Sequence, residues 1–210
     1  VAAGRVVRAI PTNTPGTHML ALGTGGTAFT ANIGGGSVSQ LDLAAGTLVR
    51  TVRTGLGPEA MDVTPDGREL WVADRRQNVI QVRDARTLDS LAAFPTGAFP
   101  NRLRFTPDGR LALVSNAAAG TLSVYDVATR TLRAAIPMPY DATRARPSPL
   151  TQSLGAGPVP LGVLVARDGR TAVVALAATG QLALVDLDAL RVVTLLEGGE
   201  TPDGMGWVGR

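Results

Sequence analysis

Short apolar runs, separated by residues that form tight turns, recur along the whole chain. Two segments with the identical sequence Thr-Pro-Asp-Gly-Arg, at 64–68 and 106–110, lie 42 residues apart. A third copy at 166–170 keeps Asp-Gly-Arg, and a degenerate one lies at 23–26. Pro fixes φ for a turn, Asp bonds the turn backbone and Gly accepts a positive φ. Each copy therefore predicts a hairpin between two strands.

Around each hairpin the same apolar runs recur in the same order, which predicts four strands in every repeat. The predicted first strands cover 18–22, 60–63, 102–105 and 161–165, and the second strands cover 28–31, 70–73, 111–115 and 171–175. The third strands alternate apolar and polar residues and end at Asp42, Asp84, Asp126 and Asp186. The fourth strands cover 48–52, 88–93, 132–136 and 192–196. Because an Asp at a strand end accepts hydrogen bonds from the next turn, we expect these four acids to be structural.

Four antiparallel strands in a period of about 42 residues are typical of a β-propeller, whose blades bury their faces against one another. We therefore predict an all-β fold in one domain, residues 1–210, with four complete blades. Segment 4–10 matches a fourth strand and segment 201–208 matches a first strand, so one extra strand is expected at each end. An outermost and an innermost strand are not neighbours in a sheet. An incomplete ring is therefore expected, from a chain that begins at Val1 and is a processed product or a fragment.

Several phrases of the second repeat carry a family resemblance. They are Gly-Pro-Glu-Ala-Met at 57–61, Thr-Pro-Asp-Gly at 64–67, Leu-Trp-Val-Ala-Asp at 70–74, Ile-Gln-Val-Arg-Asp at 80–84 and Thr-Leu at 87–88. Together they resemble the YVTN-repeat β-propellers, also described as surface-layer-type or lactonase-like. The resemblance implies a seven-bladed ring and an exported bacterial protein of the periplasm or cell surface. The Gly-His and Trp-Asp pairs of WD40 propellers are missing.

Composition excludes several classes of function. There is no Cys, so neither disulfides nor thiolate metal sites are possible. All 20 basic residues are Arg, but the formal net charge is only +3 and aromatic residues make up 4% of the chain. A nucleic-acid partner is not expected, because such surfaces interleave basic and aromatic side chains. No apolar run is long enough to span a membrane, and the chain contains no signal peptide.

The first strand of a propeller blade lines the central channel and begins at the face that carries the loops between blades, which we call the mouth face. The residue after the repeat's Pro begins that strand, and it is polar in most repeats. A polar ring around the channel mouth is a candidate ligand site. Its predicted members are His18, Glu59, Asn101 and Asp203, with Arg102 beside them.

Two loops are expected on the same face. The loop after the second strand of the second blade carries Arg75 and Arg76. The segment 138–156 breaks the 42-residue period by 18 residues and contains Tyr140, Arg144 and Arg146. A long loop on a rigid scaffold is often functional, although a tolerated insertion explains it equally well. We include these five side chains among the candidate ligand-binding residues.

The residue set gives little support for catalysis. His18 is the single histidine, so zinc and haem sites lack donors, and no Gly-x-Ser-x-Gly motif accompanies it. A hard cation held by Glu59 and Asp203 is an alternative, but we predict no metal, no cofactor and no catalytic residue.

The leading hypothesis is a non-enzymatic, exported binding or scaffold propeller that holds a protein, glycan or small-molecule ligand at the mouth face. The alternative is a lactonase-like hydrolase acting on a sugar lactone. The resemblance implies that such an enzyme needs His, Glu and Arg at the channel, which here reduces to His18, Glu59 and Arg102.

Overall fold

The computed structural model describes residues 4–207 and contains four sheets, each of four antiparallel strands in sequence order. The first sheet contains β1 (Thr17–Leu22), β2 (Thr27–Asn32), β3 (Ser37–Asp42) and β4 (Thr47–Arg53). The second contains β5 (Pro58–Val63), β6 (Glu69–Asp74), β7 (Val79–Asp84) and β8 (Ser90–Pro95). The third contains β9 (Pro100–Phe105), β10 (Leu111–Asn116), β11 (Thr121–Asp126) and β12 (Thr131–Pro137). The fourth contains β13 (Pro160–Val165), β14 (Thr171–Leu176), β15 (Gln181–Asp186) and β16 (Arg191–Glu197). The predicted four-bladed, all-β fold is confirmed.

The predicted hairpin turns form where the Asp-Gly pairs lie. Gly67, Gly109 and Gly169 have φ values of 75°, 71° and 69°, in the left-handed region that glycine adopts without steric cost. In the second blade the Thr64 hydroxyl donates to Asp66 at 2.6 Å, and the third blade repeats this bond between Thr106 and Asp108 at 2.6 Å. The identical sequences therefore build identical turns.

Blades pack face to face through apolar side chains. Trp71 is fully buried between the second and third blades, with its ring 5.3 Å from that of Phe94 and 5.4 Å from that of Phe105 in edge-on contacts. The junction of the third and fourth blades is aliphatic and includes Leu113 and Val174. Because each blade buries its faces only against a neighbour, each of the three junctions has its own apolar cluster.

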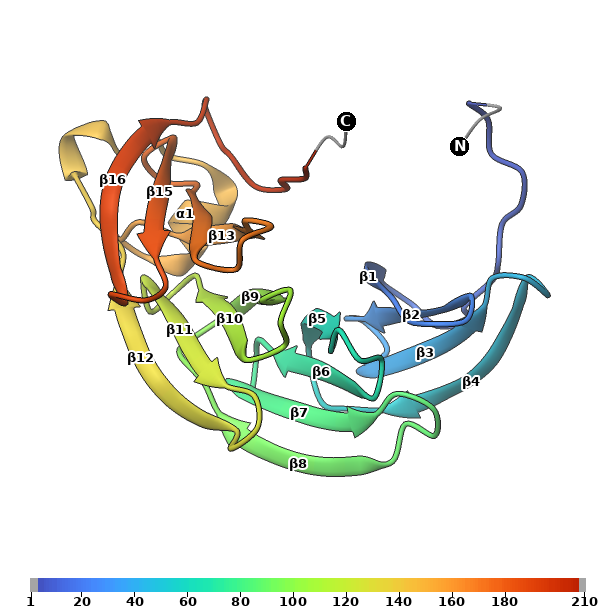
Figure 1. Ribbon diagram of the computed structural model, residues 1–210. Coiled ribbons are helices and arrows are strands. Elements are labelled where there is room, and N and C mark those ends of the chain that lie inside the picture. Colours follow the sequence, from blue (N-terminus) through green and yellow to red (C-terminus); the bar gives the residue numbers. More distant parts are fainter. Residues whose placement is uncertain (1–3, 208–210) are drawn as a thin grey trace.

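The blades are arranged in an open arc, with the first strands on its inner side and the fourth strands on its outer side (Figure 1). Strand β5 contacts β1 and β9, and β9 contacts β13, so the four first strands form a continuous inner wall. Successive first strands thus bring residues one repeat apart next to one another.

The extra strands expected at the two ends are not formed in the part of the chain that the structure describes. Residues 4–16 and 201–207 contain no strand, and Val208 lies outside the described residues. A strand needs a neighbour that satisfies its backbone groups, and no ladder partner is described for either segment. Residues 201–207 nevertheless run beside β13, since the Trp207 indole donates to the carbonyl of Val165 at 2.8 Å.

One strand boundary was also wrong. The fourth strand of the second blade begins at Ser90, not at Leu88. Leu88 belongs to the preceding turn, where it has a φ of 63° and its N–H donates to the carbonyl of Asp84. Its side chain is buried against the first blade, which explains why it looked like a strand residue in the apolar pattern.

Between β12 and β13 the chain leaves the repeat and forms two short helices, η1 (Ala142–Arg144) and α1 (Pro149–Leu154). Ser148 and Thr151 form a capping box that begins α1. The segment is fastened to the fourth blade, since the N–H of Arg146 donates to Ala178 at 2.8 Å. Among the described residues, no helix has the length and apolar character needed to cross a membrane.

Candidate functional site

Each first strand carries a β-bulge where it begins at the mouth face. In β5, Pro58 pairs with Asp74 and Ala60 pairs with Ala73, which leaves Glu59 without a partner in the ladder. The other first strands show the same shift of register close to their first residues. The bulged residues are His18 in β1, Glu59 in β5, Asn101 in β9 and, in β13, Leu161 with Gly162. A bulge re-aims the extra side chain, so the fold itself creates the ring of positions predicted from the sequence.

Glu59 is the centre of a charged cluster on the inner wall. Its side chain is 3% exposed, and its Oε2 lies 2.6 Å from Nη1 of Arg75. Its Oε1 accepts a hydrogen bond of 3.1 Å from the amide of Asn101. Nη1 of Arg102 lies 3.9 Å and Nδ1 of His18 lies 3.8 Å from the same oxygen. A carboxylate this buried is stable only with such compensation.

Arg102 links the cluster to the segment after β16. Its Nη1 donates to the carbonyl and the side-chain oxygen of Asn101, at 3.0 and 2.9 Å. Its Nη2 lies 3.0 and 3.2 Å from the two carboxylate oxygens of Asp203. The structure therefore brings together six predicted site residues, and we call them the mouth cluster: His18, Glu59, Arg75, Asn101, Arg102 and Asp203.

Asp74 positions this cluster, and the sequence reasoning missed it as a site residue. Its side chain is buried and accepts four backbone N–H bonds of 2.7–3.0 Å, from Leu56, Gly57, Arg76 and Gln77. These bonds fix both the loop that carries Arg75 and the approach to Glu59. The available signal was the spacing of Asn32, Asp74 and Asn116, which lie 42 residues apart at the ends of second strands.

A second charged pair lies farther along the inner wall. Nη1 of Arg104 in β9 is 3.8 Å from Oδ2 of Asp62 in β5. Burial raises the pKa of Asp62, although the Arg104 guanidinium acts in the opposite direction. Charged side chains on β5 and β9 therefore continue along the inner wall beyond the mouth cluster.

The remaining predicted residues do not join the mouth cluster. The backbone N–H of Arg76 is bound by Asp74, and its side chain is exposed. Arg144 bonds both carboxylate oxygens of Glu197 at 2.7 Å. Tyr140 and Arg146 line a separate shallow pocket of about 340 Å³ between the inserted segment and the loop at Ala178. The sequence predicted that all five loop residues lie on the mouth face, and of these only Arg75 reaches the mouth cluster.

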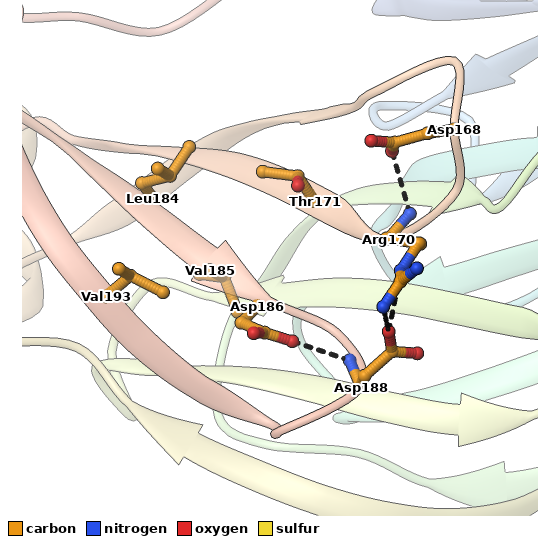
Figure 2. A pocket seen from close by; sticks show the side chains of 8 residues that line it. All are labelled: Asp168, Arg170, Thr171, Leu184, Val185, Asp186, Asp188 and Val193. Carbon is orange, nitrogen blue, oxygen red and sulfur yellow. Dashed lines mark hydrogen bonds and ion pairs between the residues drawn. The ribbon is translucent and has the colours of Figure 1, made fainter.

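The face opposite the mouth also carries pockets. One of them, on the fourth blade, has a volume of about 320 Å³, and its lining side chains are drawn in Figure 2. There the guanidinium of Arg170 is paired with Asp188 at 2.7 Å, and the N–H of Asp188 donates to Asp186 at 2.9 Å. Leu184 also lines this pocket. The residues at the same position in the second and third blades, Val82 and Val124, are completely buried under the next blade. This pocket is an uncovered junction between blades, so we place the candidate site at the mouth cluster.

The predicted structural role of the acids that end the third strands is confirmed. Asp84 accepts N–H bonds from Arg86 and Thr87, each of 2.8 Å, and these backbone donors lower its pKa. Asp42, Asp126 and Asp186 hold their turns in the same way. Within residues 4–207, three or more His, Asp or Glu side chains nowhere gather in a group that could hold a metal ion.

Comparisons with known proteins agree with this architecture. The profile of the family described as "Lactonase, 7-bladed beta-propeller" matches residues 28–135. No curated protein has a significantly similar sequence. Among solved structures, hydrazine synthase of Kuenenia stuttgartiensis is similar, with a TM-score of 0.72 and 25% sequence identity over 91% of this chain. The match covers 51% of that structure's chain, so the present chain spans about half the length of this relative.

Proposed function

The chain belongs to the lactonase family of seven-bladed β-propellers, and from this premise we propose that it is a binding module whose ligand site is the mouth cluster. The proposed ligand is a small polar molecule. A small ligand is favoured over a protein or glycan because the central groups are recessed: Glu59 is 3% and Arg102 is 13% exposed.

The observation that carries this proposal is the difference between equivalent bulges. The fourth blade has Leu161 at the position that Glu59 occupies in the second blade, so the bulge does not require a charged side chain. Burying a carboxylate together with guanidinium groups costs desolvation energy that an apolar residue avoids. A charged group kept in such a position is expected to serve recognition, here through the partly exposed His18 and Arg75.

Export to the periplasm or cell surface, which the family resemblance implies, remains part of the proposal. Its test is fractionation of the native host with an antibody against the chain. Recovery in the cytoplasm alone would contradict it.

A thermal-shift screen of small sugars, sugar acids and amino acids tests binding. We expect at least one compound to raise the melting temperature of the unaltered protein, because a ligand that binds only the folded state stabilises it. His18→Ala should abolish that shift without unfolding the protein, since the His18 side chain is 51% exposed. Arg170→Ala, on the opposite face, is the matched control. A shift that survives His18→Ala but is lost in Arg170→Ala would place the site elsewhere.

Lactone hydrolysis is the second candidate, and a specific contact favours it. His18 and Arg102 lie 3.8 and 3.9 Å from the same oxygen of Glu59, and the matching family is described as a lactonase. In such a reaction the exposed imidazole would take a proton from water as the water oxygen bonds to the lactone carbonyl carbon, and a guanidinium would stabilise the oxyanion formed there. When the ring C–O bond breaks, the imidazolium would give that proton to the released alcohol oxygen.

Hydrolysis of gluconolactone, followed by proton release, tests this candidate. Turnover above the spontaneous rate that is lost in His18→Gln, but kept in Arg170→Ala, would establish an enzyme. A rate equal to the spontaneous one would contradict this second candidate and leave the binding proposal standing.

A further inference from the structure

Arg102 presents one amino group of its guanidinium to a carboxylate that comes from far along the sequence. Both oxygens of Asp203 lie within 3.2 Å of Nη2 of Arg102, 101 residues away. The other amino group of Arg102 is held by Asn101 at 2.9 and 3.0 Å, so the orientation of the guanidinium is fixed from behind. A guanidinium fixed in orientation recognises carboxylates through charge-assisted hydrogen bonds, and here the single nitrogen Nη2 contacts both carboxylate oxygens.

Asp203 is easily replaced in this contact. Its side chain is 47% exposed, whereas that of Arg102 is only 13% exposed. The backbone beside it packs on Gly162, and Trp207 is bonded to Val165, so the segment can stay in place while the Asp203 side chain rotates away. A contact between an exposed carboxylate and a guanidinium contributes little to stability.

We propose that Asp203 occupies the subsite for a carboxylate group of the ligand and competes with that group for Arg102. This inference rests on the proposed function and names the ligand class: a small carboxylic acid. Binding then requires exchange of one carboxylate for another. The measured affinity is the intrinsic affinity multiplied by the fraction of molecules in which Asp203 has released Arg102.

The cluster also explains why a negative ligand group is accepted close to Glu59. Glu59 is paired with Arg75 at 2.6 Å and receives the amide of Asn101 at 3.1 Å. Among the described residues, Asp203 is therefore the one carboxylate within hydrogen-bond distance of Arg102, since Glu59 lies 3.9 Å away. When the Asp203 side chain turns to solvent, the subsite keeps a positive charge.

The test is calorimetric titration of the full chain with gluconate, and with glucitol as the uncharged compound of the same carbon skeleton. Asp203→Asn should bind gluconate about fivefold more tightly than the unaltered protein does, because the competing charge is gone. Arg102→Ala should lose gluconate binding. Asp188→Asn removes the same charge from the opposite face and should leave the affinity unchanged. Melting curves confirm that each variant is folded.

The outcomes separate this inference from the proposed function. Equal or weaker gluconate binding by Asp203→Asn, with Arg102→Ala inactive, would overturn the competition and leave the binding site standing. Binding of glucitol as tight as that of gluconate would overturn the carboxylate class alone. Gluconate binding that persists in both Arg102→Ala and His18→Ala would overturn the proposed site as well.

Discussion

The two faces of the arc use the same repeat in opposite ways. On the face opposite the mouth, the second and third blades hold the same turn residues and make the same bonds: Arg68 and Arg110 donate their N–H groups to Asp66 and Asp108 at 3.1 and 3.0 Å. At the mouth, equivalent positions hold different residues that bond one another across blades, as Asn101 does with Glu59 at 3.1 Å.

This difference separates what the fold requires from what it permits. A hairpin turn of this type needs a glycine at a fixed place, and in the second to fourth blades a carboxylate precedes it, so repetition there reports backbone geometry. A bulge needs only one extra residue, and its side chain can vary without disturbing the blade. In a repeat protein, a functional site is therefore expected where equivalent positions hold different residues and those residues contact one another.

The largest predicted effect comes from removing the buried charge at the mouth. Glu59→Gln should lower the free energy of unfolding by about 2–3 kcal/mol, because it leaves Arg75 and Arg102 without their buried partner. Urea denaturation measures this loss. Glu197→Gln, which breaks an exposed pair with Arg144, is the control and should cost well under ~1 kcal/mol. Equal effects for the two variants would show that the mouth cluster is not a coupled, buried unit.

Intermediate effects are expected in the repeated turns. Gly67→Ala and Gly109→Ala should each destabilise by about 1 kcal/mol, since both residues have a positive φ. Gly67→Ala should cost more, because its new methyl group would lie 2.6 Å from Cγ2 of Thr24, whereas the methyl group at Gly109 meets only Pro65 at 3.5 Å. Gly157→Ala, in open space, is the control. A neutral melting curve for both turn variants would contradict the assigned turns.

The smallest effect concerns acid. The Thr106 hydroxyl, followed by the N–H of Arg110, lowers the pKa of Asp108 to about 2. A lowered folded-state pKa gives stability that is present above about pH 4 and is lost as the pH falls toward 2. Because Asp108 is exposed, the contribution stays below ~1 kcal/mol. Thr106→Val should raise this pKa and flatten the acid dependence, as carboxyl chemical shifts would report. An unchanged Asp108 titration would show that the hydroxyl is not the cause.

The repeat spacing was sufficient to predict the four sheets, because each Asp-Gly turn marks the hairpin between two strands of a blade. The ring of His18, Glu59 and Asn101 could also be predicted, but its bulges could not, since a bulge in the ladder leaves no apolar signature. The bulge also settles the register of the first blade, which the Gly-rich turn at 23–26 had obscured. The contact of Arg75 with Glu59 depends on Asp74 fixing a loop, which is a tertiary effect.

The inserted segment shows the same limit. Its place on the mouth face followed from strand order, but the partners of Arg144 and Arg146 depend on how the segment folds back on the fourth blade. Spacing predicts the face on which a residue lies, and packing decides which neighbour it meets.

The central claim is that the mouth cluster is a ligand site, and a side-chain NMR titration with gluconate tests it most directly. We predict that gluconate shifts the guanidinium signals of Arg75 and Arg102 and the amide signal of Asn101. The signals of Arg110 and Arg170 on the opposite face should stay in place. Shifts confined to the opposite face, or to Arg146 in the inserted segment, would contradict the account.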